Sequence, residues 1–309
     1  MAMDNRPDPF FENPPPRTVV STLRDAYELG IYSVLRHAPI DVASDVGSAI
    51  VRWSVPRNRP WIIKGARRNL RILRPDLEPE AIDSTIHSFL DNVGRLMAEF
   101  SVLHRLCGEG RIELSPGMVA LRASLKRRDE PTLALVLHTG NWEVLAADLH
   151  HQSITCTTFA EPPQTWAQRF IASKVRRSLG MHLLHGDVRG LGAAREELAA
   201  GGLVSIFGDE AKAGRSMSPL FGRQPHREGN LAAAAWLARR TDARIFVCHV
   251  RRMYRSRFYV DGSAPFRLGP ATKRSNDQIL EDVAALNEVV EPIIRANLDQ
   301  WYFLDDRID

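Results

Sequence analysis

Apolar residues recur at three- and four-residue intervals through the first third of the chain, a spacing typical of amphipathic helices. The expected helices are Ser21–Leu35, Val42–Val55, Trp61–Leu73 and a long helix that begins at Pro79. Pro56 is expected to end the second helix, because its ring removes a backbone N–H and clashes with the preceding turn. Residues 18–106 are therefore predicted to be helical, and their pattern indicates no particular chemistry.

Beyond residue 107, short apolar runs alternate with helical stretches, which predicts βαβ units around a largely parallel sheet. The expected strands are Ile112–Leu114, a run ending at His138, Ile154–Phe159, Met181–Leu184, Leu203–Phe207, Ala243–Val250 and an antiparallel Arg257–Val260. The expected helices are Pro116–Lys126, Trp142–His150, Gln164–Ser178, Gly190–Ala200, Leu231–Arg239 and Asn276–Asn297, the last kinked near Pro292.

These patterns predict an α/β fold, with a mixed, largely parallel sheet flanked by helices and a helical N-terminal region. We expect one domain over residues 18–309, made of a helical part (18–106) and an α/β core (107–309). Residues 1–17 are rich in proline and are expected to form a flexible or extended tail. The tail lacks the order of a signal peptide, and no apolar run approaches the length of a standard transmembrane helix.

Charge and cysteine content narrow the classes of partner. The net charge is only +4, but basic residues cluster along Lys64–Arg74, Arg169–Arg177 and Arg251–Arg257. Such clusters attract nucleic acid, anionic lipid head groups or phosphorylated substrates, and the absence of a nucleic-acid-binding motif makes nucleic acid the weakest of these candidates. The 3 cysteines lie far apart, which fits a reducing cytosol, and we expect neither a metal site nor a cofactor.

One apolar run delivers an ionisable group in a distinctive setting. His138 follows a buried strand and precedes a glycine turn, and Glu143 lies in the first turn of the next helix. The His-x4-acid spacing also occurs at His104/Glu109 and His182/Asp187, but only His138 combines strand end, glycine turn and helix start. Open α/β sheets keep reactive groups at such strand ends. The Leu203–Phe207 strand similarly ends at Gly208-Asp209-Glu210.

A histidine and a carboxylate at this position suggest general-base catalysis. A neutral imidazole can take a proton from a hydroxyl, and a carboxylate that accepts its other N–H fixes the tautomer. Because no nucleophile elbow, zinc-protease motif or phosphate-binding loop is present, the base would activate a substrate hydroxyl directly. On the residues alone, a structural reading stays open, in which His138 bonds a turn and Glu143 offsets a helix dipole.

The hexamer His138-Thr139-Gly140-Asn141-Trp142-Glu143 resembles the H-x-G-N-W-D/E signature of the bacterial lipid A late (lauroyl/myristoyl) acyltransferases and the related phosphatidylinositol mannoside acyltransferase. Further elements of that family have similar counterparts in the same order. They are Arg67-Arg68-Asn69-Leu70, Arg176-Arg177-Ser178-Leu179-Gly180-Met181, Gly208-Asp209-Glu210, Pro219-Leu220-Phe221-Gly222 and the stretch from Gly229 to Ala238.

This resemblance implies an acyltransferase-like fold with an apolar groove for an acyl chain. It also implies an O-acyltransferase that moves a fatty acyl group from acyl-carrier protein or acyl-CoA to a hydroxyl of a lipid or glycolipid. His138 would be the base, oriented by Glu143, with Asp209 or Glu210 as supporting acid. Backbone N–H groups of the turn or a nearby arginine would hold the oxyanion. Substrate contacts would come from Asn141, Trp142, Arg176 and Arg177.

Two departures from the family leave the acceptor open. Val19–Leu35 carries charged residues where relatives have a strongly apolar helix, so contact with the cytosolic face of the inner membrane is expected to be peripheral. Ala211 replaces a commonly found second aspartate, so lipid A is not assumed as the acceptor. The alternatives are an acyl thioesterase, in which the base activates water, and a non-catalytic lipid-binding homologue.

Overall fold

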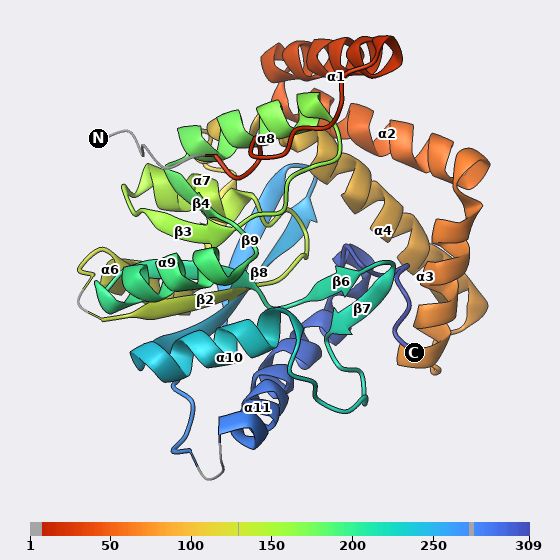
Figure 1. The fold of residues 1–309 in the computed structure, drawn as a ribbon. Coiled ribbons are helices and arrows are strands. Elements are labelled where there is room, and N and C mark those ends of the chain that lie inside the picture. Colours follow the sequence, from red (N-terminus) through yellow and green to blue (C-terminus); the bar gives the residue numbers. More distant parts are fainter. Residues whose placement is uncertain (1–7, 129, 272–274) are drawn as a thin grey trace.

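The computed structural model describes residues 8–128, 130–271 and 275–309. Its helical N-terminal part comprises α1 (Val19–His37), α2 (Ile40–Asn58), α3 (Pro60–Leu73), α4 (Pro79–Glu99) and the short α5 (Leu103–Leu106). Figure 1 shows these helices along the upper and right-hand sides of the molecule, with the strands and remaining helices below and to the left. The structure thus has the predicted helical N-terminal region followed by an α/β core.

A seven-stranded sheet forms the centre, in the order β1-β9-β8-β2-β5-β3-β4. Its strands are β1 (Ile112–Leu114), β2 (Thr132–Val136), β3 (Cys156–Phe159), β4 (Met181–Leu184), β5 (Leu203–Phe207), β8 (Arg244–Tyr254) and β9 (Arg257–Gly262). All neighbours are parallel except β8 and β9, which pair antiparallel as the sequence predicts. A separate two-stranded ribbon is formed by β6 (Glu210–Lys212) and β7 (Arg215–Ser218).

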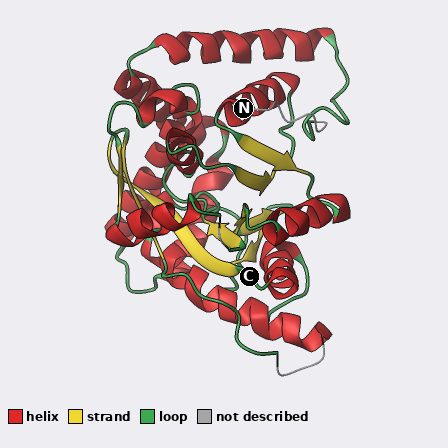
Figure 2. Cartoon of the chain, turned by 90° about the vertical axis from the view of Figure 1, so that its left-hand side faces the viewer, coloured by secondary structure: helices red, strands yellow, loops and turns green. Residues whose placement is uncertain are grey.

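Helices cover both faces of this sheet, as Figure 2 shows from the side. They are α6 (Pro116–Leu125), α7 (Val144–His151), α8 (Trp166–Ser178), α9 (Val188–Ala199), α10 (Gly229–Thr241) and α11 (Ser275–Ala296). Alternate residues of β2 face opposite layers, since Leu133 and Leu135 join one hydrophobic core and Ala134 and Val136 the other. The first core also contains Leu70 of α3, so the helical part and the sheet share it.

Helices α2 and α4 touch through their backbones. A Cβ atom on Gly47 would lie 2.2 Å from the carbonyl oxygen of Gly94, so only glycine permits this approach. The close packing fixes α4 against α2, and the polar residues Asn92 and Glu99 of α4 bond to the turn after β2. The N-terminal helices therefore support the site described below.

The structure corrects some predicted boundaries. Pro56 does not end α2, which continues to Asn58, because a proline in the last turn forfeits only a single helical hydrogen bond. In the predicted tail, Phe10 is fully buried and Asp8 pairs with Arg177, so the described part of that segment is anchored to the core. Residues 1–7 of the tail lie outside the described residues. Within the described chain, no helix is both long and apolar enough to cross a bilayer.

Candidate active site

The register of the two central strands brings two polar side chains together. β2 and β5 are parallel neighbours, with Val136 opposite Phe207, so the residues two positions further along each strand, His138 and Asp209, also lie side by side. Both stand at the carboxyl edge of the sheet, where parallel strands present reactive groups. The pairing of these two strands, rather than local sequence proximity, therefore assembles the site.

Asp209 is the partner of the His138 imidazole. Its Oδ1 lies 3.0 Å from Nδ1 of His138, and its two carboxylate oxygens also accept from the His138 backbone N–H at 3.0 and 3.1 Å. The indole Nε1 of Trp301 donates to Oδ2 at 2.8 Å. Asp209 is fully buried, so these bonds replace its contacts with water. A carboxylate only accepts, so this contact selects the neutral tautomer in which Nδ1 carries the proton and Nε2 has the lone pair.

The expected pairing of His138 with Glu143 is wrong. The carboxylate of Glu143 is bound to Arg176, with Nη2 of the arginine 2.5 Å from Oε1. Glu143 belongs to the turn that leads into α7, and its carboxylate meets Arg176 of α8. The pairing of β2 with β5 therefore brings Asp209 to His138, although Glu143 is much nearer in sequence. Arg176 is consequently paired within the protein.

The Gly-Asn-Trp turn is held by buried polar contacts. Asn141 donates from Nδ2 to Glu99 at 2.9 Å, and its Oδ1 accepts the backbone N–H of Glu143 at 3.2 Å. Gly140 has a φ of +57°, and a Cβ there would lie 2.4 Å from the carbonyl oxygen of Val250. The glycine of the motif is therefore required by backbone geometry, and the asparagine ties the turn to α4.

Sequence reasoning missed the residues beneath this turn. Arg252 and Glu99 form a buried bidentate ion pair, with distances of 2.6 and 2.9 Å. Arg252 also donates to Asn92, which in turn donates to the carbonyl oxygen of Gly140 at 3.0 Å. Asn92 and Glu99 lie seven residues apart among the apolar positions of α4. Two polar residues on the same, otherwise apolar face of a helix are a pattern from which their structural role could have been predicted.

The other predicted polar residues lie apart from the imidazole. Glu210 accepts the backbone N–H of Asn230 at 2.8 Å, in the first turn of α10, where a carboxylate is favourable. Arg177 approaches Asp8, with its Nε 3.2 Å from the carboxylate. Of the two acids predicted after β5, only Asp209 reaches His138. No group of three or more metal-ligating side chains occurs within the described residues.

Aromatic rings surround His138. The Phe207 ring stacks on the imidazole with centroids 3.8 Å apart, and Trp142 and Phe303 meet it edge to face at 4.6 and 4.8 Å. The C-terminal segment also supplies the backbone N–H of Tyr302, which donates to the His138 carbonyl at 2.9 Å. The His138 side chain remains 15% exposed, so a reacting group can reach it. Nothing in the sequence indicated that the last ten residues form this wall.

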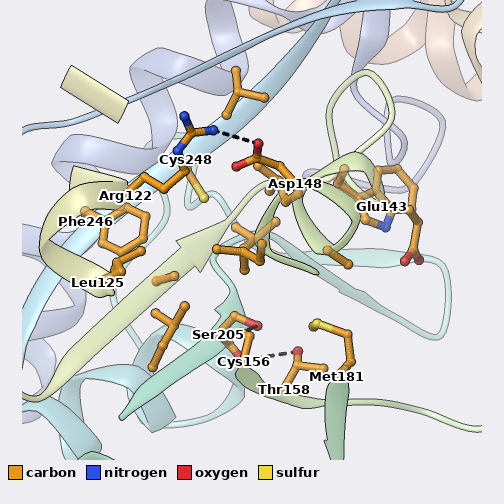
Figure 3. A pocket seen from close by; sticks show the side chains of 18 of the residues that line it. Arg122, Leu125, Glu143, Asp148, Cys156, Thr158, Met181, Ser205, Phe246 and Cys248 are labelled. Carbon is orange, nitrogen blue, oxygen red and sulfur yellow. Dashed lines mark hydrogen bonds and ion pairs between the residues drawn. The ribbon is translucent and has the colours of Figure 1, made fainter. Parts of the chain in front are cut away.

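An apolar cavity of about 90 Å³ lies under the sheet's carboxyl edge. Trp142 and Phe207, which both touch His138, line it at one end, and Leu125 and Phe246 line it farther along the strands. Figure 3 shows Glu143 at the opposite side from Leu125 and Phe246. The cavity therefore passes next to two side chains that contact the imidazole, and it runs between the sheet and its covering helices.

Charged and thiol groups also face this cavity. Arg122 and Asp148 form an ion pair at 2.9 Å, drawn as a dashed line in Figure 3. Burial raises the pKa of Asp148 even though Arg122 opposes this shift. Burial also raises the pKa of Cys156 to about 11 and that of Cys248 to about 12. Both thiols are consequently protonated at neutral pH and act as apolar lining.

The comparisons with known proteins concern almost the whole chain. The sequence profile of a family described as bacterial lipid A biosynthesis acyltransferase matches residues 18–308. No curated protein sequence matches. Among solved structures, the 1-acyl-sn-glycerophosphate (LPA) acyltransferase PlsC from Thermotoga maritima is 12% identical, with a TM-score of 0.36, over 81% of this chain and 97% of that chain.

Proposed function

We propose that this chain, which belongs to the bacterial lipid A biosynthesis acyltransferase family, moves a fatty acyl group from an acyl thioester to a hydroxyl of a lipid or glycolipid. Family membership supports an acyltransferase. The thioester of acyl-carrier protein or CoA and the nature of the acceptor are the proposed refinements. The observation that carries them is a histidine, His138 held by Asp209, in contact with two aromatic residues that line an apolar cavity.

In the proposed reaction, Nε2 of His138 takes the proton of the acceptor hydroxyl. The oxygen attacks the thioester carbonyl carbon, and a tetrahedral intermediate forms with a negative oxygen. Its collapse forms the new ester, breaks the C–S bond and returns the proton from the imidazolium to the leaving thiolate. Asp209 keeps the imidazole in the required tautomer and stabilises its positive charge.

The turn after β2 offers hydrogen-bond donors for the oxyanion. The backbone N–H groups of Asn141 and Trp142 donate no hydrogen bond to another described residue, whereas that of Gly140 is bound to Gln300. We assign these two N–H groups to the oxyanion, since preorganised backbone donors are the usual means of stabilising it. Arg176 is the less suitable candidate, because Glu143 already neutralises its charge.

The apolar cavity is the proposed site of the acyl chain. A volume of about 90 Å³ holds only part of a fatty chain, so lining side chains must yield when the chain enters. Met118 and Met181 are suited to this, because an unbranched thioether side chain adopts many rotamers at low cost. The Glu143–Arg176 pair lies at the cavity wall, and we propose that it maintains the shape of the entrance.

The proposed acceptor is amphiphilic and the donor is water-soluble, so the reaction requires an enzyme at a membrane surface. We propose that the protein works peripherally on the cytosolic face of the inner membrane, where both substrates meet. No cofactor is needed for this chemistry, because the thioester itself supplies the activated acyl group.

The test is incubation of the purified protein with acyl-CoA or acylated carrier protein, with and without lipid acceptors, followed by mass spectrometry of the lipids. An acylated lipid that appears with wild-type protein and disappears with His138→Ala is the expected result. Acceptor-independent release of fatty acid at the full rate would instead establish the thioesterase. Equal turnover by wild-type protein and His138→Ala would refute the assigned base.

A further inference from the structure

Helix α1 turns a stripe of large apolar side chains outward, while its inward side holds acidic residues together with Tyr32 and Leu35. It packs against α8, and Asp25 on its inner face is buried. Its large apolar side chains are exposed at three- and four-residue spacing, with Leu23 at 68%, Tyr27 at 69% and Val34 at 72%. A helix at a water-exposed surface ordinarily turns its large apolar side chains toward the core. Both Figure 1 and Figure 2 show this helix at the uppermost edge of the molecule.

Specific hydrogen bonds fix this orientation. Asp25 accepts the backbone N–H of Ala167 at 3.1 Å, in the first turn of α8. Glu28 accepts from the hydroxyl of Thr165 at 2.6 Å and from the amide of Gln168 at 3.1 Å. Both carboxylates thus lie at the positive end of the α8 dipole. Rotating α1 to hide its apolar stripe would break these bonds, so the outward stripe is built into the fold.

The next two helices also carry exposed large apolar side chains. The buried face of α2 packs on α4, and its opposite face carries exposed side chains spaced four and three residues apart. We define the N-terminal apolar surface by its exposed members, which are Val19, Val20, Leu23, Tyr27, Ile31, Val34, Val42, Val46, Ile50, Trp53 and Trp61. Most of the exposed large apolar side chains of the described residues belong to this set, whereas single exposed apolar residues are ordinary on a protein surface.

Charge distinguishes the partner of this surface. The sequence from Arg17 to Arg71 holds 10 basic and 4 acidic residues, and all four acids are engaged. Asp25 and Glu28 bind α8, while Asp41 pairs with Arg111 and Asp45 with Arg95, at 2.8 and 2.7 Å. The basic side chains exposed beside the stripe are Arg17, Arg24, Arg52, Arg57, Arg59 and Lys64. The guanidinium of Arg57 also lies 4.9 Å from the Trp53 ring centre.

We propose that the N-terminal apolar surface docks the protein onto an anionic phospholipid bilayer, with α1 lying in the plane of the interface. Apolar side chains enter the acyl boundary, exposed tryptophans lie at head-group level, and the basic residues meet lipid phosphates. A second copy of the chain fits this surface poorly, because two such basic faces would repel each other. The biological role of this docking rests on the proposed function, because docking would bring the site to a lipid acceptor.

Binding to vesicles tests the proposal without turnover. Wild-type protein is expected to sediment with vesicles of phosphatidylglycerol and phosphatidylcholine. The triple variant Leu23→Ser, Tyr27→Ser, Val34→Ser should partition about 100-fold less, because three exposed apolar side chains no longer enter the bilayer. Val188→Ser is the matched control, since Val188 is 82% exposed but lies on α9, and its binding should equal that of wild-type.

Charge is tested separately with Arg24→Gln, Arg52→Gln, Lys64→Gln. This variant should lose about fivefold in binding per charge on anionic vesicles and change little on pure phosphatidylcholine. The docking is overturned if wild-type protein does not bind anionic vesicles, or if the apolar triple variant binds them equally well. It is also overturned by a particular result from light scattering. In that result, wild-type protein forms a dimer that vesicles do not dissociate, and the triple variant is monomeric.

Turnover on a detergent-dispersed acceptor separates this proposal from the proposed function. The apolar triple variant should retain wild-type turnover there, since the docking surface is distinct from the site around His138. Vesicle binding by a wild-type protein that transfers no acyl group would support docking while refuting the function. Acyl transfer by a wild-type protein that binds no vesicle would support the function while refuting the docking.

Discussion

Replacing Asp209 by asparagine should separate the two carboxylates that compete for the role of orienting His138. Asp209 accepts from the imidazole Nδ1, from the His138 backbone and from Trp301. An asparagine amide keeps the size of the side chain but offers a single accepting oxygen. The imidazole would then favour the tautomer in which Nε2 carries the proton, and this tautomer cannot act as the base.

The size of the effect follows from the loss of that tautomer. The same change in a serine protease triad lowers kcat by about 10⁴, so we expect Asp209→Asn to lose about 10³ to 10⁴ in kcat with little change in KM. Glu143→Gln should stay within about tenfold of wild-type, because a glutamine oxygen can still accept from Arg176. Steady-state kinetics with an acyl thioester and a lipid acceptor measures both.

Folding controls keep this comparison interpretable. Asp209 is fully buried, so the substitution also leaves a donor without a partner and should lower the free energy of unfolding by about 1–3 kcal/mol. Circular dichroism and urea unfolding check that the variant is folded at the assay temperature. ¹⁵N NMR of the histidines provides a second readout, because the two imidazole tautomers have distinct nitrogen shifts. A folded Asp209→Asn variant with near wild-type kcat, or a Glu143→Gln variant that is equally inactive, would refute the reasoning.

Three further predictions follow from other contacts. Arg252→Met should lower the free energy of unfolding by about 3–5 kcal/mol, because it removes the buried partner of Glu99. Urea unfolding of this variant beside the double variant Arg252→Met, Glu99→Met should show recovery in the double variant. An equal loss in both would contradict the ion-pair account. Ala134→Leu should shift the preferred donor to shorter acyl chains, since Ala134 lines the cavity four residues before His138; an unchanged profile with graded acyl-CoA donors would move the acyl chain elsewhere. Burial, reinforced by Asp306, raises the pKa of Asp305 from 3.8 to about 6, so the folded state holds this proton more tightly and stability falls as the pH rises through that interval. Asp305→Asn should therefore be more stable than wild-type above pH 6 by up to about 3 kcal/mol, and a wild-type advantage at pH 8 would contradict this.

The elements of the fold were predictable because their signals are local. The strands Met181–Leu184 and Leu203–Phe207 have the predicted bounds, since each is a short apolar run between turn residues. The antiparallel pairing of β8 with β9 follows from a turn too short for a crossover. Boundaries shifted where neighbouring residues compete, as at α7, which begins at Val144 rather than Trp142.

The site was only partly predictable, because its partners come from distant parts of the sequence. His138 was singled out by its strand end and glycine turn, and Asp209 by the same arrangement after β5. Their contact depends on β2 and β5 being neighbours in register, which no local pattern specifies. Glu143 looked like the partner because it is five residues away, yet α8 supplies Arg176 to it. Trp301 gave no signal at all, since its role depends on where the chain ends in space.

We propose that the protein moves a fatty acyl group from a thioester to a lipid hydroxyl, with His138, held by Asp209, as the base. Mass spectrometry of lipids from cells that carry wild-type protein or His138→Ala tests it most directly. We predict a lipid heavier by one acyl group that is present with wild-type protein and absent with the variant, and this shift would identify the acceptor and the chain together. Identical lipid profiles at equal protein levels would contradict the claim.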